Sequence, residues 1–176
     1  FIILCSQSPD YLLPSSACIL QERTGLSVNI GAFDINLGCS GYIYCLGLAK
    51  GLVETGQASN VMLATSDTYS KYIHPKDKSV RTIFGDAATV TVISAENEPD
   101  GPIGYLGPFE YGADGRGAEN LIVTHGGAKH PWSEKSFVEV EDKNGNIRSP
   151  KNLYMNGAEV FSFFLNRVPE LLKSLL

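Results

Sequence analysis

The sequence predicts an α/β layered fold with a largely parallel central sheet. Over residues 1–95, short apolar runs rich in β-branched residues alternate with helix-like runs, and this alternation is typical of βαβ units. Of the 176 residues, 43% are hydrophobic and 19% are charged, so the chain has enough apolar surface for a core and too little charge for a disordered protein.

Four runs are expected to form strands: FIILC (1–5), AFDINL (32–37), NVMLATS (60–66) and AATVTVIS (87–94). A short helix is expected to open at Pro14, with Ser15 or Ser16 as its cap, and to close on Gly25. A second helix is expected over 39–54. Apolar residues occupy nearly every face of that run, which predicts a helix buried all round.

The composition changes after residue 95. Residues 96–150 are rich in glycine, proline and charge, which predicts an extended loop-and-hairpin region with a turn at Asn144–Gly145. A last helix is expected to start near Asn156, with Glu159 completing a capping box, and to kink at Pro169. The predicted organisation is therefore a first α/β region (1–95), a loop-and-hairpin region (96–150) and the first helix of a further region (151–176).

Composition argues against several classes of protein. A net charge of −5 and a pI near 5.2 disfavour a nucleic-acid binder. Apolar runs fall short of the roughly 18 residues that cross a bilayer, and FIIL is too short for a signal-peptide core, so a cytoplasmic protein is expected. The four cysteines form no C-x-x-C pair, and His125 and His130 are expected to be loop residues, so we expect no metal site.

The stretch FDINLGCSGY places Cys39 between Gly38 and Gly41, where a strand is expected to stop and a helix to begin. The two glycines let the backbone turn sharply and let another molecule approach. A helix N-terminus favours a thiolate, and backbone N–H groups at such a turn can stabilise an oxyanion. These features suit nucleophilic chemistry on a thioester, whereas the alternative is a buried thiol under a tight turn. Cys5, Cys18 and Cys45 are expected to be small buried hydrophobic residues.

Four stretches carry a resemblance to a known family: FDINLGCSGYIYCLGLAKGLVETG, VMLATSDTYSKYIHPKDKSVRTIFGDAATVTVIS, GADGRGAENLIVTHGGAKHP and LYMNGAEVF. In this order they resemble the β-ketoacyl-acyl-carrier-protein synthase III family of the thiolase superfamily. The resemblance implies that Cys39 is the acyl-accepting nucleophile. It also implies a thiolase-like layered α/β/α fold with two similar halves. This chain would hold most of the first half and the start of the second.

Further positions follow from the same resemblance. Lys78 stands at the family's coenzyme A-contacting arginine, with Arg81 nearby; the alternative is that this basic stretch is a solvated loop. Leu13 falls where family members reach across a dimer into the partner's acyl pocket. The FGDAATV stretch keeps the family's turn at Gly85 and Asp86 but makes it bulkier.

The sequence also departs from the family. Complete members carry a His in a His-Gln-Ala-Asn motif and an Asn in a Gly-Asn-Thr-Ser-like motif. Here none of His74, His125 and His130 lies in such a motif, and the family's opening βαβ unit is missing before Phe1. We therefore expect a central fragment of a longer enzyme that does not catalyse condensation by itself.

The predicted function is that of a condensing acyltransferase of fatty acid biosynthesis. It would form a β-ketoacyl product from an acyl-coenzyme A primer and malonyl-acyl carrier protein, with no cofactor beyond these substrates. Two alternatives stay open: another thiolase-superfamily synthase of polyketide or quinolone type, and a non-catalytic partner subunit of a condensing enzyme. Neither nucleic acid nor membrane is an expected partner.

A two-fold homodimer is expected as well. Residues 60–66 are apolar along their length and lack the charges or prolines that protect natural edge strands, which predicts that this strand pairs with its own copy across the axis. The apolar cluster Phe161, Phe163, Phe164 and Leu165 is expected to lie in the core or at the dimer interface.

Overall fold

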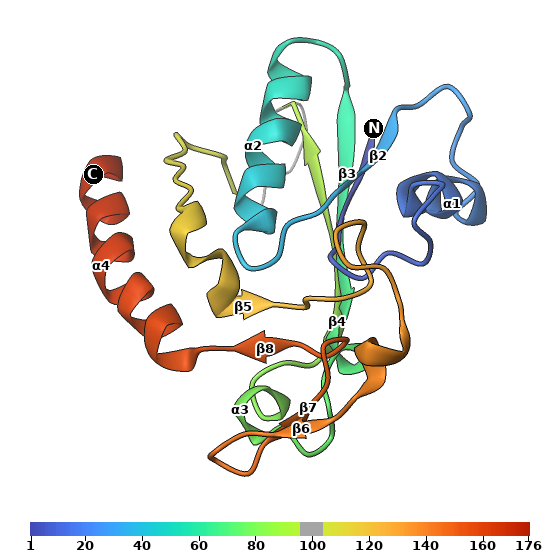
Figure 1. The fold of residues 1–176 in the computed structure, drawn as a ribbon. Helices are drawn as coiled ribbons and strands as arrows, with labels where there is room; N and C mark the ends of the chain where they lie inside the picture. The colour runs from blue at the N-terminus through green and yellow to red at the C-terminus, as the bar shows by residue number, and fades with distance from the viewer. Residues whose placement is uncertain (96–103) are drawn as a thin grey trace. The chain divides into compact units, whose positions relative to one another are not determined.

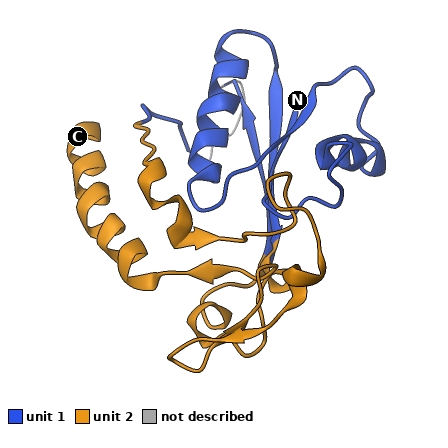
Figure 2. Ribbon diagram, viewed as in Figure 1, with its two compact units in different colours: residues 1–67, 87–109 blue, residues 68–86, 110–176 orange. Residues whose placement is uncertain are grey.

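The chain forms two compact units in the computed structural model, which describes residues 1–95 and 104–176 (Figure 1). Unit 1 consists of Phe1–Asp67 and Ala87–Phe109, and unit 2 of Thr68–Asp86 and Glu110–Leu176 (Figure 2). Part of the predicted loop region, residues 96–103, lies outside the described residues. The three-region organisation expected from the sequence remains a prediction about the whole protein.

The sheet of unit 1 has the strand order β2-β1-β3-β4. Its strands are β1 (Ile2–Cys5), β2 (Ala32–Ile35), β3 (Asn60–Thr68) and β4 (Asp86–Ser94). Strand β1 runs parallel to both of its neighbours, with Ile3 opposite Phe33 on one side and opposite Leu63 on the other. All four predicted strands are confirmed, and so is parallel pairing at the centre of the sheet.

Strand β1 is buried on both faces because a helix covers each of them. Successive side chains of a strand point to opposite faces. Ile3 and Cys5 therefore join a core cluster with α2 (Gly41–Glu54), whereas Ile2 and Leu4 join a second cluster with Ala17 of α1 (Ser16–Arg23). The two helices flank the sheet in Figure 1. This arrangement is the predicted α/β/α layering.

The prediction that residues 60–66 form an edge strand is wrong. Strand β3 lies inside the sheet, between β1 and β4. Val61, Leu63 and Ala64 are all at most 5% exposed. A strand covered on both faces is apolar along its whole length. An unprotected edge strand would show the same apolar pattern in the sequence. The apolar run therefore reflects burial within the chain's own sheet.

The expectation that the second helix is buried all round is also wrong. Helix α2 buries one face, formed by Gly41, Cys45, Leu46 and Ala49. Its other side carries Tyr42, Ile43 and Leu48, which are 39–46% exposed. A helix packed on a sheet buries only the stripe that faces the sheet, and the remaining apolar residues of α2 lie at the surface of this chain.

Unit 2 contains short elements and one long helix. They are η1 (Tyr69–Lys71), α3 (Lys78–Arg81), η2 (Gly115–Asn120), β5 (Leu121–Ile122), η3 (Glu134–Phe137), β6 (Val140–Glu141), β7 (Ile147–Arg148), β8 (Tyr154–Met155) and α4 (Gly157–Leu175). Strands β6 and β7 form the predicted hairpin. Its turn uses Gly145 with φ +76°, a left-handed conformation that favours glycine. Strands β5 and β8 pair antiparallel.

Helix α4 begins as predicted, because the Asn156 side chain accepts a hydrogen bond from the Glu159 N–H at 3.4 Å. The helix is assigned without a break through Pro169. Its apolar cluster Phe161, Phe163, Phe164 and Leu165 is 45–63% exposed, so the prediction that it lies in the core of this chain is wrong. Its packing at a dimer interface remains a prediction.

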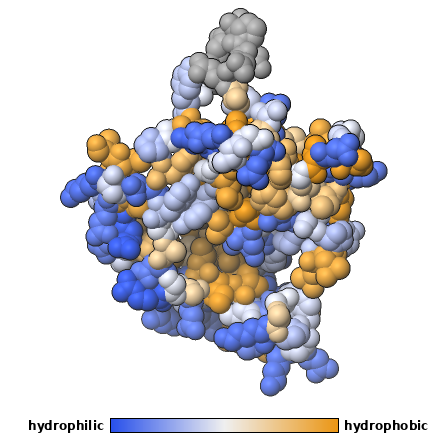
Figure 3. Space-filling model, turned by 90° about the horizontal axis from the view of Figure 1, so that it is seen from above, coloured by the Kyte–Doolittle hydropathy of each residue, from blue (hydrophilic) through white to orange (hydrophobic). Residues whose placement is uncertain are grey.

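Apolar residues lie at the surface elsewhere too. Figure 3 shows orange apolar residues among polar ones on one face of the molecule. Within the described part of the chain, no helix is both long and apolar enough to span a bilayer.

Candidate active site

Cys39 lies in the turn that connects β2 to α2. The strand ends at Ile35 and the helix begins at Gly41. The Gly41 N–H donates to the Gly38 carbonyl at 2.8 Å, which closes the turn around Cys39. Cys39 itself is exposed. Its predicted placement between a strand and the first turn of a helix is therefore confirmed.

Gly41 is required for close packing rather than for a special backbone conformation. Neither Gly38 nor Gly41 has a positive φ, so the turn does not depend on a backbone conformation that favours glycine. A Cβ atom on Gly41 would instead overlap the sulfur of Cys5, which lies directly against it. The close neighbour is thus the chain's own strand β1, and a glycine lets α2 approach that strand.

Two of the remaining cysteines form a buried pair beneath this turn. The Cys5 thiol donates to the Leu37 carbonyl at 3.2 Å. Burial raises the pKa of Cys5, and it raises the pKa of Cys45 to about 12, with the neighbouring Cys5 adding to that effect. Both are small buried residues, as the sequence predicted. Cys18 is exposed, contrary to prediction, because α1 buries only Ser16 and Ala17.

Leu13 lies in an exposed loop whose two ends are fixed by carboxylates. Leu13 is 82% exposed. Before it, the Gln7 N–H and the Ser8 hydroxyl donate to Asp67 Oδ1 at 2.8 and 3.1 Å. After it, the Ser16 and Ala17 N–H groups donate to Asp34 at 2.7 Å each.

Sequence reasoning missed both carboxylates, Asp34 and Asp67. The signal that could have found them is an isolated carboxylate inside an otherwise apolar strand, in AFDI and in NVMLATSDT. Such a side chain needs hydrogen-bond donors when it is partly buried; the N–H groups at the start of α1 supply them to Asp34, and the loop residues Gln7 and Ser8 supply them to Asp67.

Lys78 and Arg81 are the two basic residues of α3, and both are exposed. Arg81 donates through Nη1 to the Pro75 carbonyl at 2.7 Å. Asp77, at the N-cap of the same helix, is fully buried and accepts from the Ser79 N–H at 3.0 Å. The structure thus presents the two cations on a segment whose one carboxylate is turned inward.

Asp86 begins strand β4, directly after Gly85. It accepts hydrogen bonds from the Ser70 N–H at 2.8 Å and the Ser70 hydroxyl at 2.5 Å, which lower the pKa of its carboxyl. Gly85 has no positive φ, and open space surrounds the position of its missing Cβ. Leu13, Gly38, Cys39 and Gly41 belong to unit 1, whereas Lys78, Arg81, Gly85 and Asp86 belong to unit 2.

His125 and His130 lie in an irregular segment, as predicted. Their rings stack with centroids 5.3 Å apart, and His125 Nδ1 is 2.9 Å from the buried Ser136 hydroxyl. Within residues 1–95 and 104–176, no group of three or more His, Cys, Asp or Glu side chains is placed to hold a metal ion.

A cavity of about 430 Å³ opens in unit 1, away from Cys39. It is lined by Phe1, Leu26, Asn29, Ile30, Gln57, Ala58, Ser59, Asn60, Met62 and Val92.

Comparison with known proteins finds similarity to one family of synthases. The model of the 3-oxoacyl-[acyl-carrier-protein] synthase III family matches residues 33–115, which include the Cys39 turn. A crystal structure of a 3-oxoacyl-(acyl-carrier-protein) synthase III superposes with a TM-score of 0.93 at 57% identity, over 99% of this chain and 51% of that one. Over nearly its whole length the chain is thus similar to a member of the 3-oxoacyl-[acyl-carrier-protein] synthase III family.

The chain is similar to other synthases of this kind as well. The β-ketoacyl-[acyl-carrier-protein] synthase III of Caldanaerobacter subterraneus is 39% identical over 92% of this chain and 45% of that protein. A synthase structure from Burkholderia xenovorans is 40% identical, with a TM-score of 0.79 over 98% of this chain and 46% of that one. The fold is thus the predicted thiolase-like one, and the chain spans about half the length of the curated relatives it matches.

Proposed function

We propose that the protein carrying this chain is a condensing acyltransferase of fatty acid biosynthesis and that Cys39 is its nucleophile. The observation that carries the proposal is the exposed Cys39 in the β2–α2 turn, inside the family match. The Cys39 thiolate attacks the thioester carbonyl of an acyl-coenzyme A. The C–S bond to coenzyme A then breaks, so that the acyl group stays on Cys39 and the coenzyme A thiolate leaves.

The second half-reaction uses malonyl-acyl carrier protein. The malonyl group loses carbon dioxide, and the resulting carbanion attacks the Cys39 acyl thioester to give a β-ketoacyl product and a free Cys39. In the family a His and an Asn stabilise the carbanion step, and the motifs that hold them do not occur in this sequence. The chain alone is therefore expected to accept an acyl group without completing condensation.

Lys78 and Arg81 would bind the phosphates of the coenzyme A donor. Both are exposed cations on α3, and the neighbouring Asp77 carboxylate is buried and paired with other groups. A lysine offers a point charge rather than the planar fork of an arginine, so Lys78 would attract phosphate without fixing its orientation. Gly85 and Asp86 would shape the turn that follows this segment.

The further proposals concern assembly and setting. Leu13 would enter the acyl pocket of the partner in a homodimer, which its exposed position allows. The protein would act in the cytoplasm with acyl carrier protein as its partner and without a cofactor other than its substrates. Residues 1–95 would form most of the first thiolase-like half, 96–150 its loop region, and 151–176 the first helix of the second half.

Acyl transfer to Cys39 is the test. The full-length natural protein that carries this sequence is incubated with radiolabelled acetyl-coenzyme A, digested, and mapped for the labelled peptide. Label on the peptide containing Cys39, lost in Cys39→Ala and retained in Cys18→Ala, supports the proposal. Label on another cysteine contradicts the role of Cys39, whereas no label together with normal binding of coenzyme A points to the non-catalytic partner subunit.

A further inference from the structure

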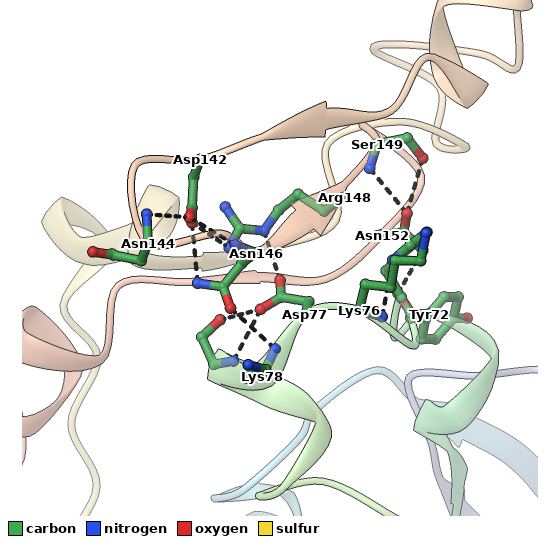
Figure 4. A network of polar contacts seen from close by, with 12 residues as sticks. Tyr72, Lys76, Asp77, Lys78, Asp142, Asn144, Asn146, Arg148, Ser149 and Asn152 are labelled. Carbon is green, nitrogen blue, oxygen red and sulfur yellow. Dashed lines mark hydrogen bonds and ion pairs between the residues drawn. The ribbon is translucent and has the colours of Figure 1, made fainter.

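The segment that carries Lys78 and Arg81 is held by a polar network built on the β6–β7 hairpin (Figure 4). At its centre is Asp77, which is fully buried. One of its oxygens, Oδ1, accepts from the Ser79 N–H at 3.0 Å and from the Ser79 hydroxyl at 2.5 Å. Its other oxygen, Oδ2, is therefore left for a partner outside α3.

Arg148 of the hairpin is that partner. Its Nε donates to Asp77 Oδ2 at 2.6 Å, and its Nη2 donates to Asp142 Oδ2 at 2.9 Å. Its guanidinium carbon also lies 5.3 Å from the centre of the Tyr154 ring. The planar guanidinium holds these two N–H groups on separate nitrogens in fixed directions, one toward each carboxylate.

Asn146 attaches the hairpin directly to the backbone of the basic segment. Its Oδ1 accepts from the Lys78 N–H at 3.1 Å, and its Nδ2 donates to Asp142 Oδ2 at 3.2 Å. The Ile147 N–H also donates to the Lys76 carbonyl at 3.4 Å. Residues 76–78 are thus fixed to the hairpin through two backbone groups and one buried carboxylate.

The charges of the network bear on Lys78 as well. Arg148 neutralises part of the negative charge of Asp77 and Asp142. Without it, two carboxylates would stand beside the segment that is to bind an anion. They would attract the ammonium of Lys78 and repel a phosphate, and Asp77 would be left buried without a counter-charge.

We infer that Arg148 is a positioning residue for donor binding, acting through Asp77 and Asn146 on the backbone that presents Lys78 and Arg81. The inference rests on the proposed function, because it needs these two side chains to meet the phosphates of coenzyme A. Arg148 does not itself touch the donor. It fixes the place and the electrostatic surroundings of the residues that do.

A double-mutant cycle tests the inference in the full-length natural protein, with coenzyme A as the probe in equilibrium titration calorimetry. Arg148→Met is expected to raise the Kd for coenzyme A about tenfold, equivalent to about 1.4 kcal/mol. Arg148→Lys keeps the charge but loses the two separate, fixed N–H donors, so a smaller rise is expected. In a Lys78→Ala/Arg81→Ala background, Arg148→Met is expected to add nothing, because the groups it positions are gone.

Two controls separate positioning from general destabilisation. Ser136→Ala removes a buried hydroxyl of the same unit that has no part in the network, so it lowers stability without raising the Kd. Arg116→Met breaks an exposed Arg–Asp pair of the same unit and should leave the Kd unchanged. The rate at which iodoacetamide alkylates Cys39 should stay within about twofold of the wild-type rate in every variant, since the β2–α2 turn keeps its structure.

The outcomes are distinguishable. A wild-type Kd in Arg148→Met, or an Arg148 effect that persists in full without Lys78 and Arg81, overturns the inference. A wild-type Kd in Lys78→Ala/Arg81→Ala shows that the proposed docking residues are wrong, whatever Arg148 does. Where Arg148→Met does not fold, Asn146→Ala replaces it. That change removes the acceptor for the Lys78 N–H and the single side-chain bond from Nδ2 to Asp142, while the Asn146 N–H still donates to Asp142, and a rise of about threefold is expected.

Discussion

The four cysteines of the chain occupy three different environments, and their reactivities should differ accordingly. Cys5 and Cys45 are buried with raised pKa values, whereas Cys18 and Cys39 are exposed. Both exposed cysteines lie near a helix N-terminus, Cys39 directly before α2 and Cys18 in the first turn of α1, but the Cys18 thiol donates to the Ala32 carbonyl at 3.9 Å. We expect iodoacetamide to label Cys39 about tenfold faster than Cys18, and both far faster than the buried pair. Peptide mapping over a time course measures this order, and earlier labelling of Cys18 or Cys5 would contradict it.

The contact between Gly41 and Cys5 gives a second prediction at the scale of single residues. Gly41→Ala would drive a methyl group into the Cys5 sulfur and should lower the unfolding free energy by about 1–3 kcal/mol. Cys5→Ala removes that sulfur, so the double variant Cys5→Ala/Gly41→Ala should be more stable than Gly41→Ala alone. Chemical denaturation measures the three values.

A matched control lies in the same helix. A Cβ atom on Gly51 of α2 would meet nothing within 4 Å, so Gly51→Ala should be neutral or stabilise the protein by up to about 1 kcal/mol. If Gly51→Ala and Gly41→Ala change the unfolding free energy equally, helix propensity rather than the Cys5 contact determines that change. The close-packing explanation of Gly41 then fails.

Local sequence patterns predicted some features of these sites and missed others. The exposed Cys39 turn and the Asn156 cap follow from neighbouring residues, and the sequence indicated both. The pairs formed by Asp77 with Arg148 and by Gly41 with Cys5 join residues 71 and 36 positions apart, and no periodicity encodes them. Of these two contacts, only the one at Gly41 has a visible feature in the sequence, the glycine itself. That glycine was interpreted as part of a sharp turn.

At the scale of elements, the β6–β7 hairpin should weaken in acid. The Asn146 N–H, which donates to Asp142 Oδ1, is the main cause that lowers the pKa of Asp142 to about 2. Burial raises the pKa of Asp77, but the hydrogen bonds from Arg148 and Ser79 outweigh it, so that pKa is lowered too. A carboxyl whose folded pKa lies below its unfolded value of about 3.9 stabilises the fold above that value. This contribution is lost as pH falls toward the folded pKa.

Asp142→Asn tests this pH dependence. The variant should unfold at a lower urea concentration than the wild type near about pH 5.5, and the difference should shrink toward zero as the pH approaches about 2. The difference between the two proteins should also be smaller in an Arg148→Met background, since Arg148 is one of the donors to Asp142. A gap in urea midpoint that stays constant over this pH range would show that Asp142 acts without its charge.

The helices and strands themselves were largely predictable from the sequence, whereas the pairing of each strand with its neighbours in the sheet was not. The alternation of β-branched runs and helix-like runs predicted β1 to β4, α1 and α2, because burial sets those patterns locally. The same apolar run, NVMLATS, is compatible with an unprotected edge and with the centre of a sheet. Only the pairing with β1 and β4 decides between them, and that pairing depends on segments far away in sequence.

At the scale of the whole molecule, the dimer must now be argued without β3, because that strand has a neighbour on each side. What supports a dimer is the loop that carries Leu13, since its apolar tip is exposed while Asp34 and Asp67 fix both of its ends. An exposed apolar side chain gains free energy when a partner buries it. Because the loop is already fixed, little conformational entropy is lost when it binds. We therefore expect the full-length natural protein to be dimeric, and Leu13→Asp to weaken dimerisation at least about tenfold by placing a charge in the partner's apolar pocket. Light scattering over a concentration series measures both, with Val28→Asp as the control, since Val28 is similarly exposed at 86% and has no proposed partner. A wild-type protein that is monomeric at every concentration contradicts the dimer, and equal effects of the two substitutions contradict the role of Leu13.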